Sequence, residues 1–315
     1  MNSTKTLRFA LFTACLACPG LSQDSGKEPG HIDKARQIDE TGQDAEKPKQ
    51  DDPKQKTTEN EKATWPAIKP VRLSITKDKI PQLVHKNEKT REKAKETIVG
   101  YGAGCAPVLL DALKHGQKPE LVTELTKILD GFVEKQYLPL LEAEWTGTDE
   151  VRDAYIISTI KRFGVEGHGE LFAKGLVHGD PAIRETATYA LAMLGDERAL
   201  HPLLLLARDS WEEKNYQIRE ALPKLKNEAT TKWLVKHLTE GEISDRIATL
   251  RLLHSAGTKD CVRAVAPLLD AKEHLIRAEA VNALRGIMDG DPPFRKLSVF
   301  QAIEEVKKWK ARVGT

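Results

Sequence analysis

The chain has 315 residues, of which 40% are hydrophobic and 30% are charged, and its formal net charge at pH 7 is +2. This length and apolar content are sufficient for one or two domains with a sizeable core. Because the charges are balanced, the sequence lacks the basic character that nucleic-acid recognition requires, and we expect no nucleic-acid partner.

Residues 1–22 have the pattern of a secretory signal peptide. A basic start precedes an apolar run that is too short to span a bilayer, and a small-x-small cleavage site ends at Ser22. A bacterial lipoprotein signal is the alternative, because residues 16–18 resemble the end of a lipobox. We therefore expect export to the periplasm, the cell envelope or the outside of the cell, with membrane attachment only through a lipid on Cys18.

Residues 23–76 are expected to form a disordered, charged linker. Up to about residue 64 this stretch is rich in Lys, Asp, Glu, Gln, Gly and Pro and has almost no apolar side chains. Such a segment cannot bury enough surface to offset the loss of chain entropy on folding. We expect a folded domain over residues 77–315.

Two amphipathic helical patterns, separated only by Gly195 and Asp196, define a short unit at residues 180–209. In the first pattern, apolar residues recur at helical spacing, with Asp180 and Pro181 at its start and Gly195 at its end. Neither helix can bury its apolar face alone. The unit therefore requires neighbours of the same kind, which is typical of a repeat protein.

The same unit recurs along the chain, and an arginine marks the first helix of six copies. The arginines are 61, 32, 35, 27 and 31 residues apart, and the largest gap holds a copy without arginine at residues 120–132. Four second helices carry a proline, which marks a first helical turn. The pattern predicts about seven helical hairpins, with arginines at Arg91, Arg152, Arg184, Arg219, Arg246 and Arg277 and prolines at Pro107, Pro139, Pro202 and Pro267.

Three stretches, LAMLGDERALHPLLLLARD, REKAKETIVGYGAGCAPVLLDALK and IRAEAVNALRGI, resemble the HEAT repeat family. The likeness is to the short HEAT-like units of phycobilisome-lyase-type proteins and covers about residues 78–290. It implies an all-α fold, an α-α superhelix or solenoid. The family includes scaffolds, enzyme subunits, bilin lyases, hydroxylases and DNA glycosylases, so the resemblance implies no single activity.

Residues 297–313 are expected to form a C-terminal capping helix. Its apolar residues fall along one face and its charged residues lie largely outside that face. A polar outer side allows a solenoid to end without aggregating. The apolar face consists of Val299, Ala302, Ile303, Val306, Trp309 and Val313.

The sequence contains no recognisable catalytic or metal-binding motif. None of the nine histidines is followed by glutamate, which argues against the His-Glu iron site of deoxyhypusine hydroxylase, a HEAT-type enzyme. No cysteine or histidine spacing is typical of zinc. Cys105 and Cys261 lie about five repeats apart, beyond disulfide reach, and we expect two unpaired, buried thiols. We predict no catalytic residue, no metal and no cofactor.

The recurring arginines have two interpretations. A guanidinium group can bind phosphate or an acidic partner. Alternatively, it can donate to helix-end carbonyls or to an acidic residue of the neighbouring unit while its stem packs. Recurrence at one repeat position favours this structural role.

The candidate interaction residues are aromatic, because tryptophan and tyrosine are enriched at binding hot spots. They fall near hairpin ends or on second helices, where filling the core is the alternative role. We predict a monomeric, noncatalytic scaffold that binds a protein or peptide across successive repeats. The alternative is a lyase- or isomerase-like HEAT protein that acts on a bound cofactor. The candidate residues are Trp145, Trp211, Tyr216 and Trp233.

Overall fold

The computed structural model describes residues 63–314. The chain divides into two units, Met1–Thr58 and Glu59–Thr315, and the described residues belong to the second unit. The expected signal peptide, the proposed lipid site Cys18 and the linker up to residue 62 lie outside the described residues. Among residues 63–314, no helix has the length and apolar character needed to cross a membrane.

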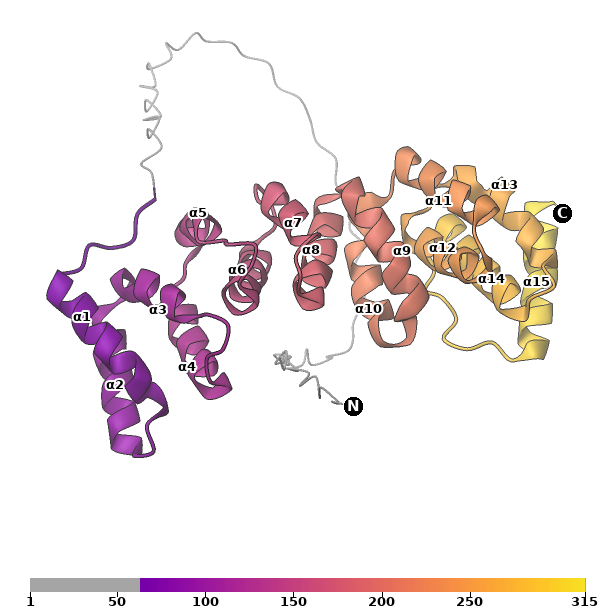
Figure 1. The fold of residues 1–315 in the computed structure, drawn as a ribbon. Coiled ribbons are helices and arrows are strands. Elements are labelled where there is room, and N and C mark those ends of the chain that lie inside the picture. Colours follow the sequence, from indigo (N-terminus) through magenta and orange to yellow (C-terminus); the bar gives the residue numbers. More distant parts are fainter. Residues whose placement is uncertain (1–62, 315) are drawn as a thin grey trace, which may run out of the picture. The chain divides into compact units, whose positions relative to one another are not determined.

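The described residues form fifteen α-helices and seven short 3-10 helices and contain no strand (Figure 1). First helices alternate with second helices, as expected for helical hairpins, and the second helix is the shorter one in every pair except α10 (Trp211–Ala221) and α11 (Glu228–Glu240). The first helices are α2 (Glu88–Tyr101), α4 (Pro119–Asp130), α6 (Glu150–Phe163), α8 (Pro181–Leu194), α10 (Trp211–Ala221), α12 (Ile243–Ala256) and α14 (His274–Met288).

The second helices are mostly preceded by a 3-10 turn. They are α3 (Ala106–Ala112), α5 (Leu138–Ala143), α7 (Gly169–Gly175), α9 (Leu200–Asp209), α11 (Glu228–Glu240) and α13 (Val262–Val265), which continues into η7 (Ala266–Asp270). The turns before them are η2 (Ala103–Cys105), η3 (Lys135–Tyr137), η4 (Glu197–Ala199), η5 (Pro223–Leu225) and η6 (Lys259–Cys261). Helix α1 (Pro70–Lys79) and η1 (Ile80–Val84) come before the hairpins, and α15 (Val299–Val313) comes after them.

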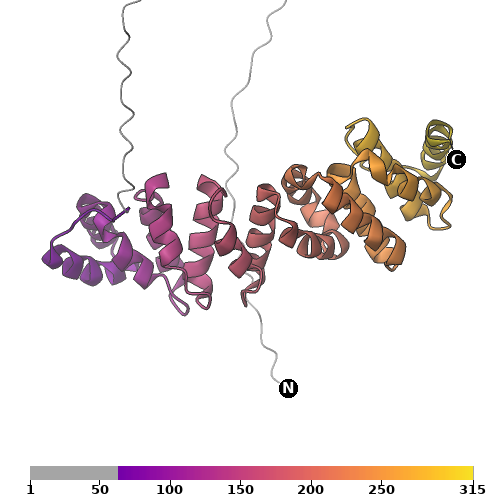
Figure 2. The same cartoon turned by 90° about the horizontal axis from the view of Figure 1, so that it is seen from above.

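Consecutive hairpins pack side by side in chain order, as Figure 2 shows from a second direction. Helix α8 contacts both α6 and α10, and α12 contacts α9, α11 and α14. Buried apolar side chains from all these hairpins belong to one continuous core. The described chain is therefore an all-α superhelix of repeated hairpins, in which each repeat is stabilised by its neighbours.

The residues predicted to start and end the first helix of the unit at residues 180–209 do so in the structure. The Asp180 side chain accepts hydrogen bonds from the backbone N–H groups of Ala182 and Ile183, which are otherwise unpaired at a helix start. Gly195 ends α8 in the left-handed conformation, with φ of 77°. A Cβ at Gly195 would also lie 2.9 Å from the carbonyl oxygen of Lys224 in the next hairpin. This glycine therefore permits both the turn and the packing.

The predicted linker extends too far along the chain, because residues 70–76 belong to α1. The segment before this helix also has fixed contacts: the rings of Trp65 and Tyr137 stack with centroids 4.7 Å apart. Ile68 packs against the core, and a Cβ at Gly104 would lie 2.6 Å from the Pro66 carbonyl oxygen. These partners lie far away in the sequence, so local composition gives no sign of them.

Helix α15 lies within the range expected for the last helix. Ser298 and Gln301 form a capping box at its start. Ala302 and Trp309 are buried, whereas Val299 and Ile303 are 58% and 43% exposed. The expected apolar face is thus only partly covered by the preceding hairpin.

Candidate functional site

Three of the recurring arginines make the same contact. Nη1 of Arg91, Arg184 and Arg277 each donates to two consecutive carbonyl oxygens in the turn just before the arginine's own helix, six and five residues earlier in the chain. The distances are 2.9 and 3.3 Å for Arg91, 2.8 and 2.7 Å for Arg184, and 2.6 and 2.8 Å for Arg277. These bonds satisfy carbonyls that lack a partner within the helix or turn that they end.

Two further arginines have a related role. Arg246 donates to the carbonyl oxygens of Gly241 and Thr239, at 3.0 and 3.3 Å. Arg152 reaches Asp111, with 3.3 Å between Nη2 and the carboxylate oxygen. The structural interpretation is therefore confirmed for five of the six arginines.

Arg219 does not belong to this group, although the sequence alignment places it there. Helix α10 begins at Trp211, so Arg219 lies in its last turn rather than near its start. Its guanidinium group lies over the Trp211 ring, 4.8 Å from the centroid. Lys214 occupies the turn where an arginine is expected, and it pairs with Glu185 of α8.

The four candidate aromatic residues do not form a common site. Trp211 is only 9% exposed, and the guanidinium groups of Arg219 and Arg251 each lie 4.8 Å from the centroid of its ring. Trp145 is half-buried after α5, with its ring edge toward His178. Trp233 is half-buried on α11 and stacks on His237, whereas Tyr216 on α10 is 69% exposed. Three of the four thus have packing partners within the fold.

Cys105 and Cys261, which lie in the described part of the chain, are unpaired and buried, as predicted. Cys261 Sγ donates to the Thr258 carbonyl oxygen at 3.0 Å, and burial raises the pKa of this thiol to about 11. Cys105 Sγ lies 3.3 Å from the Thr76 hydroxyl group. Within residues 63–314, no three His, Cys, Asp or Glu side chains lie close enough together to hold a metal ion.

Several charged side chains of the first helices contact a neighbouring hairpin. Arg162 of α6 donates to Asp130 of α4 at 2.7 Å. Further along, Arg251 of α12 donates to Glu279 of α14 at 3.1 Å. Such side chains are committed to packing, so a binding surface is better sought where charges have no partner.

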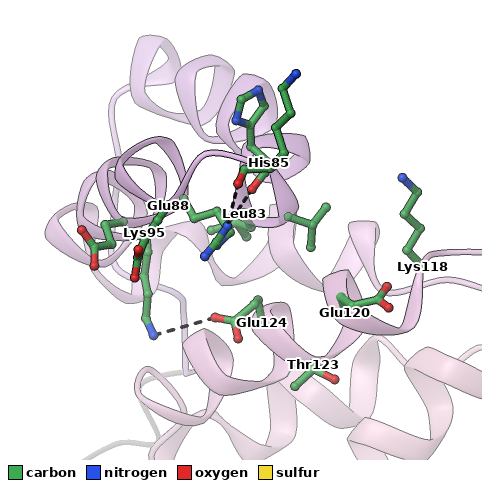
Figure 3. Close-up of a pocket in the computed structure, with 12 residues that line it drawn as sticks. Leu83, His85, Glu88, Lys95, Lys118, Glu120, Thr123 and Glu124 are labelled. Atoms are coloured by element: carbon green, nitrogen blue, oxygen red, sulfur yellow. Dashed lines mark hydrogen bonds and ion pairs between the residues drawn. The ribbon is translucent and has the colours of Figure 1, made fainter.

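A cleft of about 760 Å³ with unpartnered charges opens where η1, α2 and the start of α4 meet (Figure 3). Leu83 and Val84 of η1 contribute its apolar part, and Thr123 adds a hydroxyl group. Four cationic and four acidic side chains also line it: Lys86, Arg91, Lys95, Lys118, Glu88, Glu92, Glu120 and Glu124.

Only part of this charge is neutralised inside the cleft. Lys95 of α2 reaches across to Glu124 of α4, with Nζ and Oε2 3.8 Å apart (Figure 3). Arg91 donates to backbone carbonyls, as described above. The other five lining charges, all exposed, have no ion pair with any described residue. The cleft can therefore offer charges of both signs to a ligand.

Sequence reasoning missed this cleft. Its residues come from three elements that are separated by up to about forty positions, and charged residues on exposed helix faces are common. Lys118 directly before Pro119 marks a helix start, but only the packing of η1 on α4 brings it near Arg91. No local motif indicates that contact.

The sequence matches no family model and no curated protein. Three solved structures are similar to it. Human deoxyhypusine hydroxylase in complex with glycerol is 17% identical, with a TM-score of 0.28, over 78% of this chain and 97% of that chain. One engineered protein is 18% identical over 76% and 71% of the two chains, with a TM-score of 0.34. A second is 15% identical over 76% and 96%, with a TM-score of 0.22.

Proposed function

We propose that this helical-repeat protein is a noncatalytic scaffold that binds a peptide segment of a partner protein in the cleft between η1, α2 and α4. The observation that carries the proposal is the combination of an open cleft of about 760 Å³ with unpartnered charges of both signs. Extended peptides carry charges of both signs at short intervals. Paired charges at such a surface give specificity and orientation.

The chemistry of the lining favours binding over catalysis. The twelve lining residues include no cysteine, serine or tyrosine that could act as a nucleophile, and Thr123 donates its hydroxyl hydrogen to the Pro119 carbonyl oxygen. Sites for cofactors and small molecules are mostly apolar and enclose the ligand. This cleft is lined largely by charged side chains, which supports a peptide ligand over the cofactor of a lyase- or isomerase-like protein.

A selection of random linear peptides on the full chain tests this function. We expect the selected peptides to carry both acidic and basic residues and to compete with one another for one site. Peptides that are purely apolar, or that bind at several unrelated places, would contradict the proposal. An absorbance spectrum with elemental analysis tests the enzyme alternative, which requires a copurifying chromophore or metal.

We also propose that the protein is exported, since residues 1–22 have the pattern of a signal peptide. Fractionation of bacteria that express the full chain, with Cys18→Ala as the comparison, tests this proposal. Recovery of the unaltered chain in the periplasm or medium indicates soluble export. Recovery in membranes that is lost with Cys18→Ala indicates a lipid anchor. A chain that stays in the cytoplasm with its first 22 residues intact would refute export.

A further inference from the structure

Helix α15 concentrates exposed apolar side chains at its start. Among residues 63–314, ten large hydrophobic residues are exposed, and three of them, Val299, Phe300 and Ile303, lie within five positions of one another. Phe300 is 82% exposed, and no other helix carries more than one such residue. Single exposed apolar residues are common on monomers, whereas clusters of them mark surfaces that contact another molecule.

The cluster belongs to the face of α15 that points away from the preceding hairpin. Ala302 and Trp309 are buried on the opposite side, where α15 packs against α14 and η7. The exposed face consists of two neighbouring ridges, in each of which the residues are four positions apart. The first ridge is Val299, Ile303, Lys307 and Ala311, and the second is Phe300, Glu304 and Lys308.

This face is complementary to a second copy of itself. Glu304 and Lys308 are placed symmetrically about the middle of the helix, near residues 305–306, and so are Phe300 and Ala311. When two such helices pair antiparallel about a two-fold axis, each of these residues meets its counterpart on the other copy. Phe300, the largest side chain of the face, then lies over Ala311, the smallest, and Glu304 lies beside Lys308.

The charged residues of the face can change partners at little cost. Within α15, Lys307 pairs with Glu304 at 3.1 Å and Lys308 pairs with Glu305 at 2.6 Å, and both lysines are exposed. Such pairs on a helix surface contribute little to stability. In the antiparallel arrangement opposite charges stay adjacent, and Ile303 meets the apolar stem of Lys307.

We propose that α15 is a self-association surface, on which a second copy of this chain docks its own α15 antiparallel through Phe300. One helix pair buries less than the area of about 1,200 Å² that is typical of stable interfaces. We therefore expect a dissociation constant on the order of 100 µM, and the monomer predicted from the sequence dominates at lower concentrations. The surface lies outside the cleft between η1, α2 and α4, so its test is independent of the proposed peptide-binding function.

Sedimentation of the full chain over a range of about 5 to 500 µM measures this association. We expect Phe300→Ser to weaken it by about tenfold or more, because an aromatic anchor is lost from the centre of the contact. Tyr216→Ser removes another exposed aromatic side chain from a helix and should leave the association within about twofold. Circular dichroism verifies folding, which we expect to persist because both side chains are largely exposed.

Two charge variants test the antiparallel arrangement. Glu304→Lys and Lys308→Glu each place like charges together in both symmetric contacts, so each variant alone should associate about fivefold or more weakly. An equimolar mixture of the two variants places opposite charges together in both contacts. We therefore expect the mixed dimer to form within about twofold of the affinity of the unaltered chain.

Each outcome decides the proposal. A chain that stays monomeric at the highest concentration would overturn it, as would equal association of Phe300→Ser and the unaltered chain. A mixture of the charge variants that associates no better than either variant alone would overturn the antiparallel pairing. If the chain stays monomeric but floats with vesicles of phosphatidylcholine and phosphatidylglycerol, and Phe300→Ser abolishes flotation, the face binds a membrane and not a second copy.

Discussion

The carboxylate of Asp153 on α6 lies 3.4 Å from Nε2 of His178, and both side chains are almost completely buried. Asp153 also accepts hydrogen bonds from the backbone N–H and the hydroxyl group of Thr146, both at 2.9 Å. The backbone N–H of Asp180 donates to Nδ1 of His178 at 3.0 Å, which places the ring hydrogen on Nε2 in the neutral form. One buried carboxylate thus connects the third hairpin to the turn before the fourth.

Removal of this carboxylate should destabilise the fold strongly. We expect Asp153→Ala to lower the free energy of unfolding by about 3 kcal/mol or more, because it removes the acceptor of both Thr146 donors and the carboxylate that lies beside the buried His178 ring. The exposed Asp78→Ala on α1 should cost about 0.5 kcal/mol or less. Urea unfolding monitored by circular dichroism measures both, and equal losses would contradict a role for Asp153 in joining the hairpins.

The close packing of α12 on α14 depends on Gly286. A Cβ at this position would lie 2.1 Å from the His254 carbonyl oxygen and 2.8 Å from its ring carbon. Because the obstacle is backbone, we expect Gly286→Ala to cost about 3 kcal/mol or to prevent folding. Gly100→Ala meets no atom within 4 Å and should be neutral or stabilising. Thermal unfolding of the two variants compares them directly, and a stable Gly286→Ala would refute this packing.

Stability should fall in mild acid partly because of His254. Burial lowers the pKa of this histidine below its ordinary value of 6.5, although its bond to the Asp291 carbonyl oxygen opposes the change. The unfolded chain therefore binds a proton more readily than the folded one, and stability is lost as the pH falls below about 6.5. We expect His254→Gln to reduce the slope of unfolding free energy against pH.

The exposed His201→Gln provides the control for that slope. It removes one histidine from the chain without changing the buried environment of His254. Its unfolding free energy should keep the pH dependence of the unaltered protein between about pH 7.5 and 5.5. A similar reduction of the slope in both variants would show that His254 does not carry the effect.

The two thiols of the repeat domain should be unreactive in the folded protein. Cys105 is fully buried and Cys261 is 1% exposed, and the raised pKa of Cys261 keeps it protonated at pH 8. Because the thiolate is the reactive form, we expect iodoacetamide to label both residues only after unfolding. Mass spectrometry of peptides that contain them measures this. Rapid labelling under native conditions would contradict the buried positions.

The hairpins could be predicted because their signals are local. Asp180, Pro181 and Gly195 act within one turn of the residues they affect. Because similar helix patterns recur in each repeat, the prediction of one hairpin supports the prediction of the others. The contact of Arg184 with the preceding turn is also local, six and five residues away. The structure confirms these features.

The remaining features depend on contacts that are distant in sequence. Arg219 was misassigned because α10 begins eight residues before it, and the start of α10 lacks a side-chain cap that would mark it. Trp65 has its stacking partner Tyr137 on another hairpin. The cleft likewise depends on the packing of η1 against α4, and only the tertiary structure shows that contact.

The most direct test of the account is the affinity of a selected peptide for charge-reversed variants of the cleft. Glu92→Lys with Lys118→Glu changes two cleft charges that have no partner, whereas Glu96→Lys with Lys114→Glu changes exposed neighbours outside the cleft. Both pairs leave the net charge unaltered. Calorimetry should show a loss of about tenfold or more for the first pair and of about twofold or less for the second. Equal affinity of the two double variants would contradict the account.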